Sequence, residues 1–341
     1  MWRKDAVGMG DIWDGLDRLL DAAEDERAVA MHGLQLLAIP RWRVTGRPVP
    51  QLWVDNQRTM SVITLGLPGL LRRIRDAVTG PIVLMKGPEL ATLYPGTGLR
   101  PFGDLDLLVD DADAAYRALS GLDFTPEEHL APDHAHHCTG LHVDGLPLRV
   151  EIHRRPNWVP WLTPPPVTEL LAAAVPSRLG IAGISTLAPE HHALAVAVHN
   201  WRDGPLLDVG QLLDTALLGR ECDPDALSRT AEAWGVRRIW GTSSRAAEAL
   251  FVGEGFSLPL LIGGRHLPRV RDRSIIGAIV SRQVGSLWAQ TPARAARALV
   301  TTVATDIRPP EGQQWSARPL RVGRILRGAL RPLSQYTDLD G

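Results

Sequence analysis

Apolar residues recur at three- and four-residue spacing through the first part of the chain. In residues 11–38 the repeated apolar positions are Ile12, Leu16, Leu19, Leu20, Ala23, Val29, Leu34 and Leu37. Acidic residues stand between them, so this spacing predicts amphipathic helices. Residues 40–50 contain Arg, Gly and Pro and are typical of a loop. Residues 52–77 return to the helical pattern, so a helical N-terminal section is expected.

The hydrophobic pattern changes after Thr79-Gly80-Pro81. Residues 82–85 are a short continuous apolar run, which is typical of a buried strand, and Lys86-Gly87 ends it. Pro88 is favoured at the first position of a helix and predicts a short one. Residues 104–109 predict a second strand and residues 112–119 a further helix, so this part of the chain is expected to be α/β.

A β-hairpin is predicted where Val143 and Leu146 flank Asp144-Gly145, a dipeptide that favours a two-residue turn. Counting outward from the turn gives these facing pairs: Leu141 with Leu148, Gly140 with Arg149, Cys138 with Glu151, and His136 with His153. Alternation along the second strand then places Leu148, Val150 and Ile152 on the core face. The opposite, polar face is expected to contain Arg149, Glu151 and His153, beside His136, Cys138 and His142 of the first strand.

The remainder of the chain is expected to be mostly helical. The predicted helical segments are residues 189–201, 206–218, 226–250, 273–288 and 292–303. The order along the chain is therefore helical, then α/β, then helical.

Composition and charge restrict the expected partners and the expected location of the protein. The 341 residues carry a net charge of −1, which gives no overall attraction to nucleic acid or anionic lipid. Cys138 and Cys222 are the only cysteines, which fits a reducing compartment. The N-terminal residues lack the apolar stretch of a secretory signal, so none is expected, and no apolar run is long enough to span a membrane. A cytoplasmic location is expected.

Asp104 and Asp106 are the first candidates for chemistry. They stand two positions apart on a predicted strand, so both carboxylates point to the same face. Adjacent carboxylates repel each other unless a cation lies between them, and Mg²⁺ prefers oxygen ligands of this kind. The alternative is a strand that ends in a polar turn, in which one aspartate caps the loop.

Residues on both sides of this pair favour phosphate chemistry. Gly87 follows a strand and allows the backbone to approach a phosphate, while Lys86 supplies positive charge. Lys4 and Lys86 are the only lysines in the chain, so Lys86 stands out. Glu151 offers a third carboxylate on a later strand. Three acids opposite a phosphate-binding turn are typical of two-metal phosphoryl or nucleotidyl transfer.

Two weaker signals have ordinary explanations. His134, His136, His137 and Cys138 suggest zinc, but neighbouring strand residues point to opposite faces, which disfavours a single ion. An arginine-rich stretch from Arg318 to Arg331 is compatible with RNA, a leader peptide or anionic lipid, and equally with a solvated helix.

The motifs resemble the uncharacterised nucleotidyltransferase family of the DNA polymerase β-like superfamily. The resemblance rests on these segments: Val83-Leu84-Met85-Lys86-Gly87, Leu93-Tyr94-Pro95, Leu99 to Val109, Val150-Glu151-Ile152-His153, Leu187-Ala188-Pro189-Glu190 with His199, and Leu212-Leu213-Asp214. It covers residues 55–220. Pro88 departs from the superfamily pattern, which has a phosphate-binding serine at this position.

The resemblance implies an α+β fold, with a small mixed sheet between two helical sections. The expected divisions are residues 1–75, helical; residues 76–160, the nucleotidyltransferase-like core; and residues 161–341, a helical C-terminal domain. It implies that Asp104, Asp106 and Glu151 are the catalytic and metal-binding residues. The expected nucleotide-binding residues are Lys86, Gly87, Arg100 and Gly103, and the expected substrate-facing residues are His136 and His153.

The expected reaction is transfer of a nucleoside monophosphate, with ATP the favoured donor, and release of pyrophosphate. Two Mg²⁺ ions are expected, with Mn²⁺ as the alternative. The expected acceptor is a hydroxyl or similar group on a small molecule or peptide, and nucleic acid is not favoured. Two alternatives stay open: a nucleotide-sugar glycosyltransferase, which also uses Asp-x-Asp, and a non-catalytic nucleotide- or peptide-binding protein on a decayed transferase core.

Overall fold

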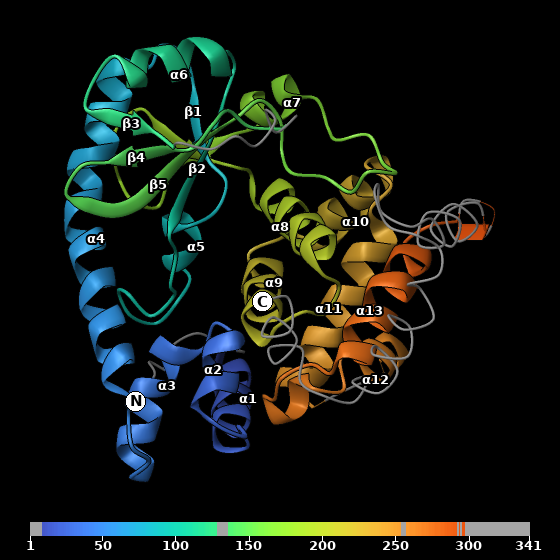
Figure 1. Cartoon of the computed structure of the whole chain (residues 1–341). Coiled ribbons are helices and arrows are strands. Elements are labelled where there is room, and N and C mark those ends of the chain that lie inside the picture. Colours follow the sequence, from blue (N-terminus) through green and yellow to red (C-terminus); the bar gives the residue numbers. More distant parts are fainter. Residues whose placement is uncertain (1–8, 128–135, 254–256, 292, 294, 297–341) are drawn as a thin grey trace, which may run out of the picture.

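A seven-stranded mixed sheet lies at the upper left of Figure 1, and the C-terminal helices lie to its lower right. The computed structural model describes residues 9–127, 136–253, 257–291, 293 and 295–296. The expected α+β class is confirmed. His134, the arginine-rich stretch 318–331 and most of the predicted helix 292–303 lie outside the described residues.

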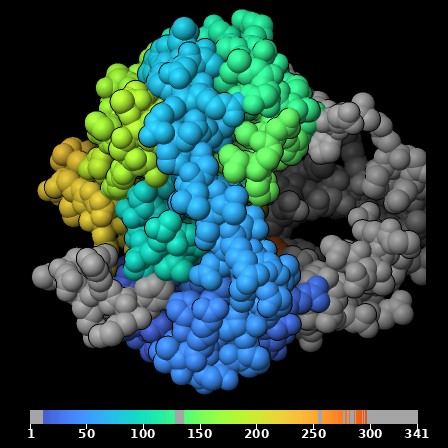
Figure 2. Space-filling view, turned by 90° about the vertical axis from the view of Figure 1, so that its left-hand side faces the viewer, coloured from blue at the N-terminus to red at the C-terminus, as the bar shows by residue number. Residues whose placement is uncertain are grey.

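The N-terminal section consists of helices, as predicted. They are α1 (Met9–Asp21), α2 (Glu26–Met31), α3 (Gln35–Thr45) and α4 (Gln51–Ala77). The loop predicted over residues 40–50 is wrong in its first half, because α3 continues through Pro40. The buried rings of Trp42 and Trp53, with centroids 4.8 Å apart, pack α3 against α4. Figure 2 shows α4 crossing one face of the molecule from these helices to the sheet.

The sheet has the order β3-β4-β5-β2-β1-β7-β6. Its strands are β1 (Ile82–Leu84), β2 (Asp104–Val109), β3 (Phe124–Pro126), β4 (Leu141–Val143), β5 (Leu146–His153), β6 (Val175–Pro176) and β7 (Ile184–Thr186). Strand β2 pairs antiparallel to β1 and parallel to β5, and β1 pairs parallel to β7. Helices α5 (Pro88–Ala91) and α6 (Ala112–Ser120) connect the strands.

Strands β6 and β7 come from beyond residue 160, where the predicted core division ends. Thr186 Oγ1 donates a hydrogen bond to the Leu84 carbonyl oxygen at 3.0 Å, which ties β7 to β1. The division into residues 1–75, 76–160 and 161–341 stays a prediction.

The hairpin of β4 and β5 forms at the predicted turn, but its predicted register is wrong beyond Val143 and Leu146. A β-bulge between His142 and Val143 shifts the pairing, so that Leu141 faces Val150. The bulge contains two extra residues of β5, so the pairing moves by two positions there. One extra residue between His137 and Leu141 then moves it back by one position, so that His137, and not His136, forms the bridge to His153.

Alternation along the strands gives the sheet two different faces. Leu105, Leu107 and Val109 of β2 join the core cluster that contains buried residues of α4 and α6. The opposite face contributes Val83 and Leu108 to a second core cluster. The polar residues Asp104, Asp106, Glu151 and His153 therefore share the sheet face that looks toward the C-terminal helices.

The C-terminal section is mainly helical, as predicted. Its elements are α7 (Val167–Ala172), α8 (Pro189–Asp203), α9 (Val209–Arg220), α10 (Pro224–Ala233), α11 (Arg237–Phe251), α12 (Leu258–Gly263), a 3₁₀ turn (Leu267–Arg269) and α13 (Ile275–Trp288). No helix in the described ranges is both long and apolar enough to cross a membrane.

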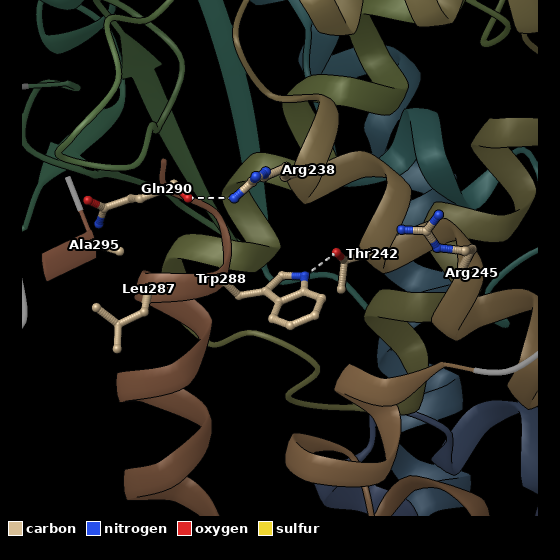
Figure 3. A pocket seen from close by; sticks show the side chains of 7 residues that line it. All are labelled: Arg238, Thr242, Arg245, Leu287, Trp288, Gln290 and Ala295. Atoms are coloured by element: carbon tan, nitrogen blue, oxygen red, sulfur yellow. Dashed lines mark hydrogen bonds between the residues drawn. The ribbon is translucent and has the colours of Figure 1, made fainter. Parts of the chain in front are cut away.

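Helices α11 and α13 border a pocket of about 550 Å³ (Figure 3). Its walls are joined by two hydrogen bonds: Trp288 Nε1 donates to Thr242 Oγ1 at 2.9 Å, and an Arg238 guanidinium nitrogen donates to the Gln290 carbonyl at 2.7 Å. None of the site residues predicted from the sequence lines this pocket.

Candidate functional site

Two carboxylates and a histidine meet on neighbouring strands. The parallel register places Asp106 of β2 beside Glu151 of β5. His153 Nε2 lies 2.9 Å from Asp106 Oδ1 and 3.5 Å from Glu151 Oε2. All three side chains are buried. Three of their ligand atoms, one from each residue, lie within 4.8 Å of one another.

Electrostatics within this group keep both carboxylates ionised. Burial alone would lower the pKa of His153, but Asp106 and Glu151 raise it to about 9. Burial tends to raise the pKa of Asp106, but Lys86 and His153 outweigh it, so that this pKa lies below its usual range. The pKa of Glu151 is also lowered, because His153 and Arg149 outweigh burial. The group is therefore a pair of carboxylates compensated by cationic side chains.

Asp104 lies at the start of β2, on the same face of the sheet but outside the three-residue group. Burial and the negative charge of Asp106 raise the pKa of Asp104, while Lys86 opposes the shift. A neighbouring carboxylate destabilises the charged form, and a bound cation would relieve that repulsion.

Lys86 extends from the end of β1 toward these acids. Its Nζ lies 3.7 Å from Asp106 Oδ2 and 3.0 Å from His199 Nε2 of helix α8. The ammonium is half-buried at the junction between sheet and helix. The ammonium therefore places positive charge beside Asp106, and the binding of phosphate by Lys86 stays a prediction.

Gly87 makes a turn that only glycine adopts without strain. Its φ is +58°, and an added Cβ would lie 2.7 Å from the Asp104 carbonyl oxygen. The turn leads into α5, a helix of four residues with Pro88 at its first position. The backbone therefore passes very close to the start of β2.

Arg100 is occupied by protein partners. It makes two hydrogen bonds to the Asp214 carboxylate, at 2.9 and 2.8 Å, and a third to the Gly87 carbonyl at 3.3 Å. Tyr94 donates to the same carboxylate at 2.8 Å. Arg100 thus anchors the Gly87 turn to α9. Gly103 precedes β2, and its carbonyl accepts the Arg149 backbone N–H at 3.0 Å.

His136 and His137 both lie beside His153, with ring centroids 5.9 and 5.3 Å from the centroid of the His153 ring. His137 also approaches the acids, since its Nε2 lies 4.0 Å from Glu151 Oε2. The expectation that Cys138 belongs to the polar face is wrong. Its sulfur lies 3.7 Å from the Ala112 carbonyl, in the core beside α6, because of the shifted register.

The acids fit a metal ion. Asp106 Oδ2 is buried and has no hydrogen-bond partner among the described residues, so one charged oxygen is left available. Carboxylate oxygens with an imidazole nitrogen are ligands that Mn²⁺ accepts, and the oxygens alone suit Mg²⁺. The residues placed to hold an ion are Asp106, Glu151 and His153. A pair of ions that also uses Asp104 stays a prediction.

Three site neighbours had no role in the sequence interpretation. His199 was only part of the resembling helical segment, and Asn157 and Asp203 gave no signal. In the structure Asn157 Nδ2 lies 3.2 Å from His199 Nδ1, and Asp203 Oδ2 lies 2.9 Å from His199 Nε2. Asp203 stands four residues after His199, a spacing that favours contact on a helix, but their meeting with Lys86 depends on tertiary packing.

The sequence comparisons agree with this arrangement. A family model described as "Uncharacterised nucleotidyltransferase" matches residues 14–252, a longer range than the motifs cover. No curated protein and no solved structure matches the chain. Since the match takes in more than half of the sequence, including the acids and Lys86, the chain belongs to the uncharacterised nucleotidyltransferase family.

Proposed function

We propose that the protein transfers a nucleoside monophosphate from a nucleoside triphosphate to an acceptor and releases pyrophosphate. ATP is the favoured donor, and a hydroxyl or similar group on a small molecule or peptide is the favoured acceptor. The observation that carries this proposal is the pairing of Asp106 with Glu151 on parallel strands beside Lys86. Family membership supports the same general reaction.

Asp104, Asp106 and Glu151 are the residues proposed to hold two Mg²⁺ ions, with Mn²⁺ as the alternative. His153 lies in the same group, and it would bind an ion only after it loses the proton that Asp106 and Glu151 stabilise by raising its pKa. When bound, such ions neutralise triphosphate charge and lower the pKa of an acceptor hydroxyl. The unpaired Asp106 oxygen and the raised pKa of Asp104 both support a cation at this position.

The protein residues then have separate tasks. Lys86 binds phosphate oxygens, and Gly87 allows the backbone to approach them. The acceptor oxygen attacks the α-phosphorus, a new P–O bond forms, and the bond between the α-phosphorus and its bridging oxygen to the β-phosphate breaks. Glu151, which is ionised, accepts the acceptor proton.

The other expected site residues support the reaction less directly. His136 and His153 are proposed to face the substrate, and Gly103 to leave space for nucleotide at the start of β2. Arg100 was expected to bind nucleotide; its bonds to Asp214 and Gly87 favour a role in fixing the turn beneath the phosphates. Direct phosphate binding by Arg100 would require these bonds to open.

The alternatives differ in what they require of the chain. A nucleotide-sugar glycosyltransferase is expected to have a large α/β nucleotide-binding half before its Asp-x-Asp, whereas residues 9–81 as described are helical up to Ala77. A transferase core that had lost its activity would not need to keep the carboxylates of Asp106 and Glu151 side by side on paired strands. Both observations favour nucleotidyl transfer.

Calorimetric titration with ATP, GTP, CTP and UTP, each with and without Mg²⁺, tests the proposal. We expect Mg²⁺-dependent binding of one triphosphate that is lost in the Asp104→Asn/Asp106→Asn variant. Asp110→Asn, which changes an exposed aspartate just after β2, is the matched control and should bind normally. Absence of binding by all four would contradict the proposal, and preferential binding of UDP-glucose would favour glycosyl transfer.

A further inference from the structure

The Lys86 ammonium lies between two acceptors at unequal distances. Its Nζ is 3.0 Å from His199 Nε2, which is hydrogen-bond distance, and 3.7 Å from Asp106 Oδ2, which is too long for a hydrogen bond. An ionised carboxylate is ordinarily the stronger partner for an ammonium, and the Asp106 oxygen is buried where such attraction is strong. A specific contact must therefore keep Lys86 away from Asp106.

His199 supplies that contact from helix α8. Its Nε2 has a second neighbour, Asp203 Oδ2, at 2.9 Å. One nitrogen serves only one of them at a time: a lone pair accepts from Lys86, whereas an N–H donates to Asp203. The position of the imidazole proton thus decides which partner His199 engages.

Asn157 contacts the other ring nitrogen of His199. Its Nδ2 lies 3.2 Å from Nδ1 and in this orientation donates to it, which leaves the imidazole proton on Nε2, while its Oδ1 is buried with no hydrogen-bond partner in the described part of the chain. If the amide turns over, Oδ1 accepts a proton carried by Nδ1, and the Nε2 lone pair is then left for Lys86. Asp203 adds negative charge on the His199 side and also attracts the ammonium.

We propose that His199 is a positioning residue that holds the Lys86 ammonium away from Asp106 Oδ2 and so keeps this oxygen open for a metal ion. The inference rests on the proposed function, because it concerns the same cation site. Without His199, the ammonium closes on Asp106, competes with the metal, and moves away from the position where it meets phosphate.

The test is Mn²⁺ affinity, measured by calorimetry and by the loss of the free-ion electron paramagnetic resonance signal. His199→Leu should bind Mn²⁺ about tenfold more weakly, which is the effect of one additional charge-assisted hydrogen bond at Asp106. His199→Gln, whose amide oxygen accepts from Lys86, should restore most of the affinity. His191→Leu, which removes another histidine of α8 that contacts Trp234, should bind as the wild type does.

The Lys86→Met background separates positioning from structural damage. Once the ammonium is absent, replacing His199 by Leu should no longer weaken Mn²⁺ binding. Equal losses with and without Lys86, or unchanged affinity in His199→Leu, would overturn the inference. If wild-type protein binds no Mn²⁺, or Asp106→Asn binds it equally well, the proposed metal site fails and the inference fails with it.

A second readout follows Lys86 itself. The chain has only two lysines, so selective lysine labelling gives two side-chain NMR signals, and Lys4→Arg assigns them. In His199→Leu the Lys86 signal should shift, while in His191→Leu it should stay. An unchanged Lys86 signal in His199→Leu, with the thermal unfolding midpoint preserved, would also overturn the inference.

Discussion

Gly87 has a backbone conformation that leaves no room for a side chain. Its φ of +58° and the 2.7 Å approach of an added Cβ to the Asp104 carbonyl make any side chain unfavourable. We expect Gly87→Ala to lower the free energy of unfolding by about 1–3 kcal/mol and to weaken triphosphate binding, because the turn must move. Urea unfolding and nucleotide titration measure the two effects.

Gly103→Ala is the control for this change. An added Cβ at Gly103 meets no atom within 4 Å among the described residues, and its φ is not positive. Its unfolding free energy should therefore stay close to that of the wild type. Equal stability of the Gly87 and Gly103 variants would contradict the structural role given to Gly87.

Individual site residues were predictable to the extent that strand periodicity determines them. Asp106, Glu151 and His153 share one face, as alternation requires. His136 and Cys138 were placed by counting from the hairpin turn, and two irregularities in the strand pairing changed their positions. His199 and Asn157 join the site only through packing of distant segments, which no local pattern encodes.

At the scale of elements, helix α8 is attached to β1 through a buried histidine. His192 Nε2 donates to the Met85 carbonyl at 2.7 Å, and burial lowers the pKa of His192 to about 4. The unfolded chain takes up a proton near pH 6.5, while the folded protein does not until about pH 4. The free energy of unfolding therefore falls as pH decreases through this interval.

We expect the free energy of unfolding to fall when the pH is lowered from 7 to 5. Because of His192, the fall should be about 2 kcal/mol larger in the wild type than in His192→Gln. Urea unfolding at the two pH values measures the difference. Asp208, whose pKa burial raises to about 7, has the opposite effect, but it is present in both proteins and cancels. Parallel pH dependence in both proteins would contradict a neutral, buried His192.

The sequence predicted β1, β2, the β4–β5 hairpin and most helices, because each carries a local period or turn signal. Strands β3, β6 and β7 were missed. They contain two or three residues each, too few for a period, and β7 becomes a strand by pairing with β1 about a hundred residues earlier. Pro40 falsely indicated a loop, because packing of α3 outweighed its cost.

At the scale of the whole molecule, the Arg100–Asp214 pair joins the site loop to the C-terminal helices. Both side chains are largely buried and the contact uses two parallel hydrogen bonds. We expect Asp214→Asn to lower the free energy of unfolding by about 3–5 kcal/mol, because it leaves a buried guanidinium without its counter-charge.

Asp55→Asn breaks the exposed pair with Arg58 and serves as the comparison. Its effect should stay below about 1 kcal/mol. Chemical unfolding measures the free energy of unfolding of both variants. A similar decrease in the free energy of unfolding in the two variants would mean that the bonds between Arg100 and Asp214 contribute little to stability. Arg100 would then be available to bind phosphate.

The central claim is that this chain moves a nucleoside monophosphate by means of Asp106. The most direct measurement incubates the protein with ATP labelled at the α- or the γ-phosphate, Mg²⁺ and a cell extract separated into small-molecule and peptide fractions. We predict that α-label enters an acceptor, that γ-label leaves as pyrophosphate, and that Asp106→Asn abolishes both. Entry of γ-label into the acceptor, or undiminished transfer by Asp106→Asn, would contradict the account.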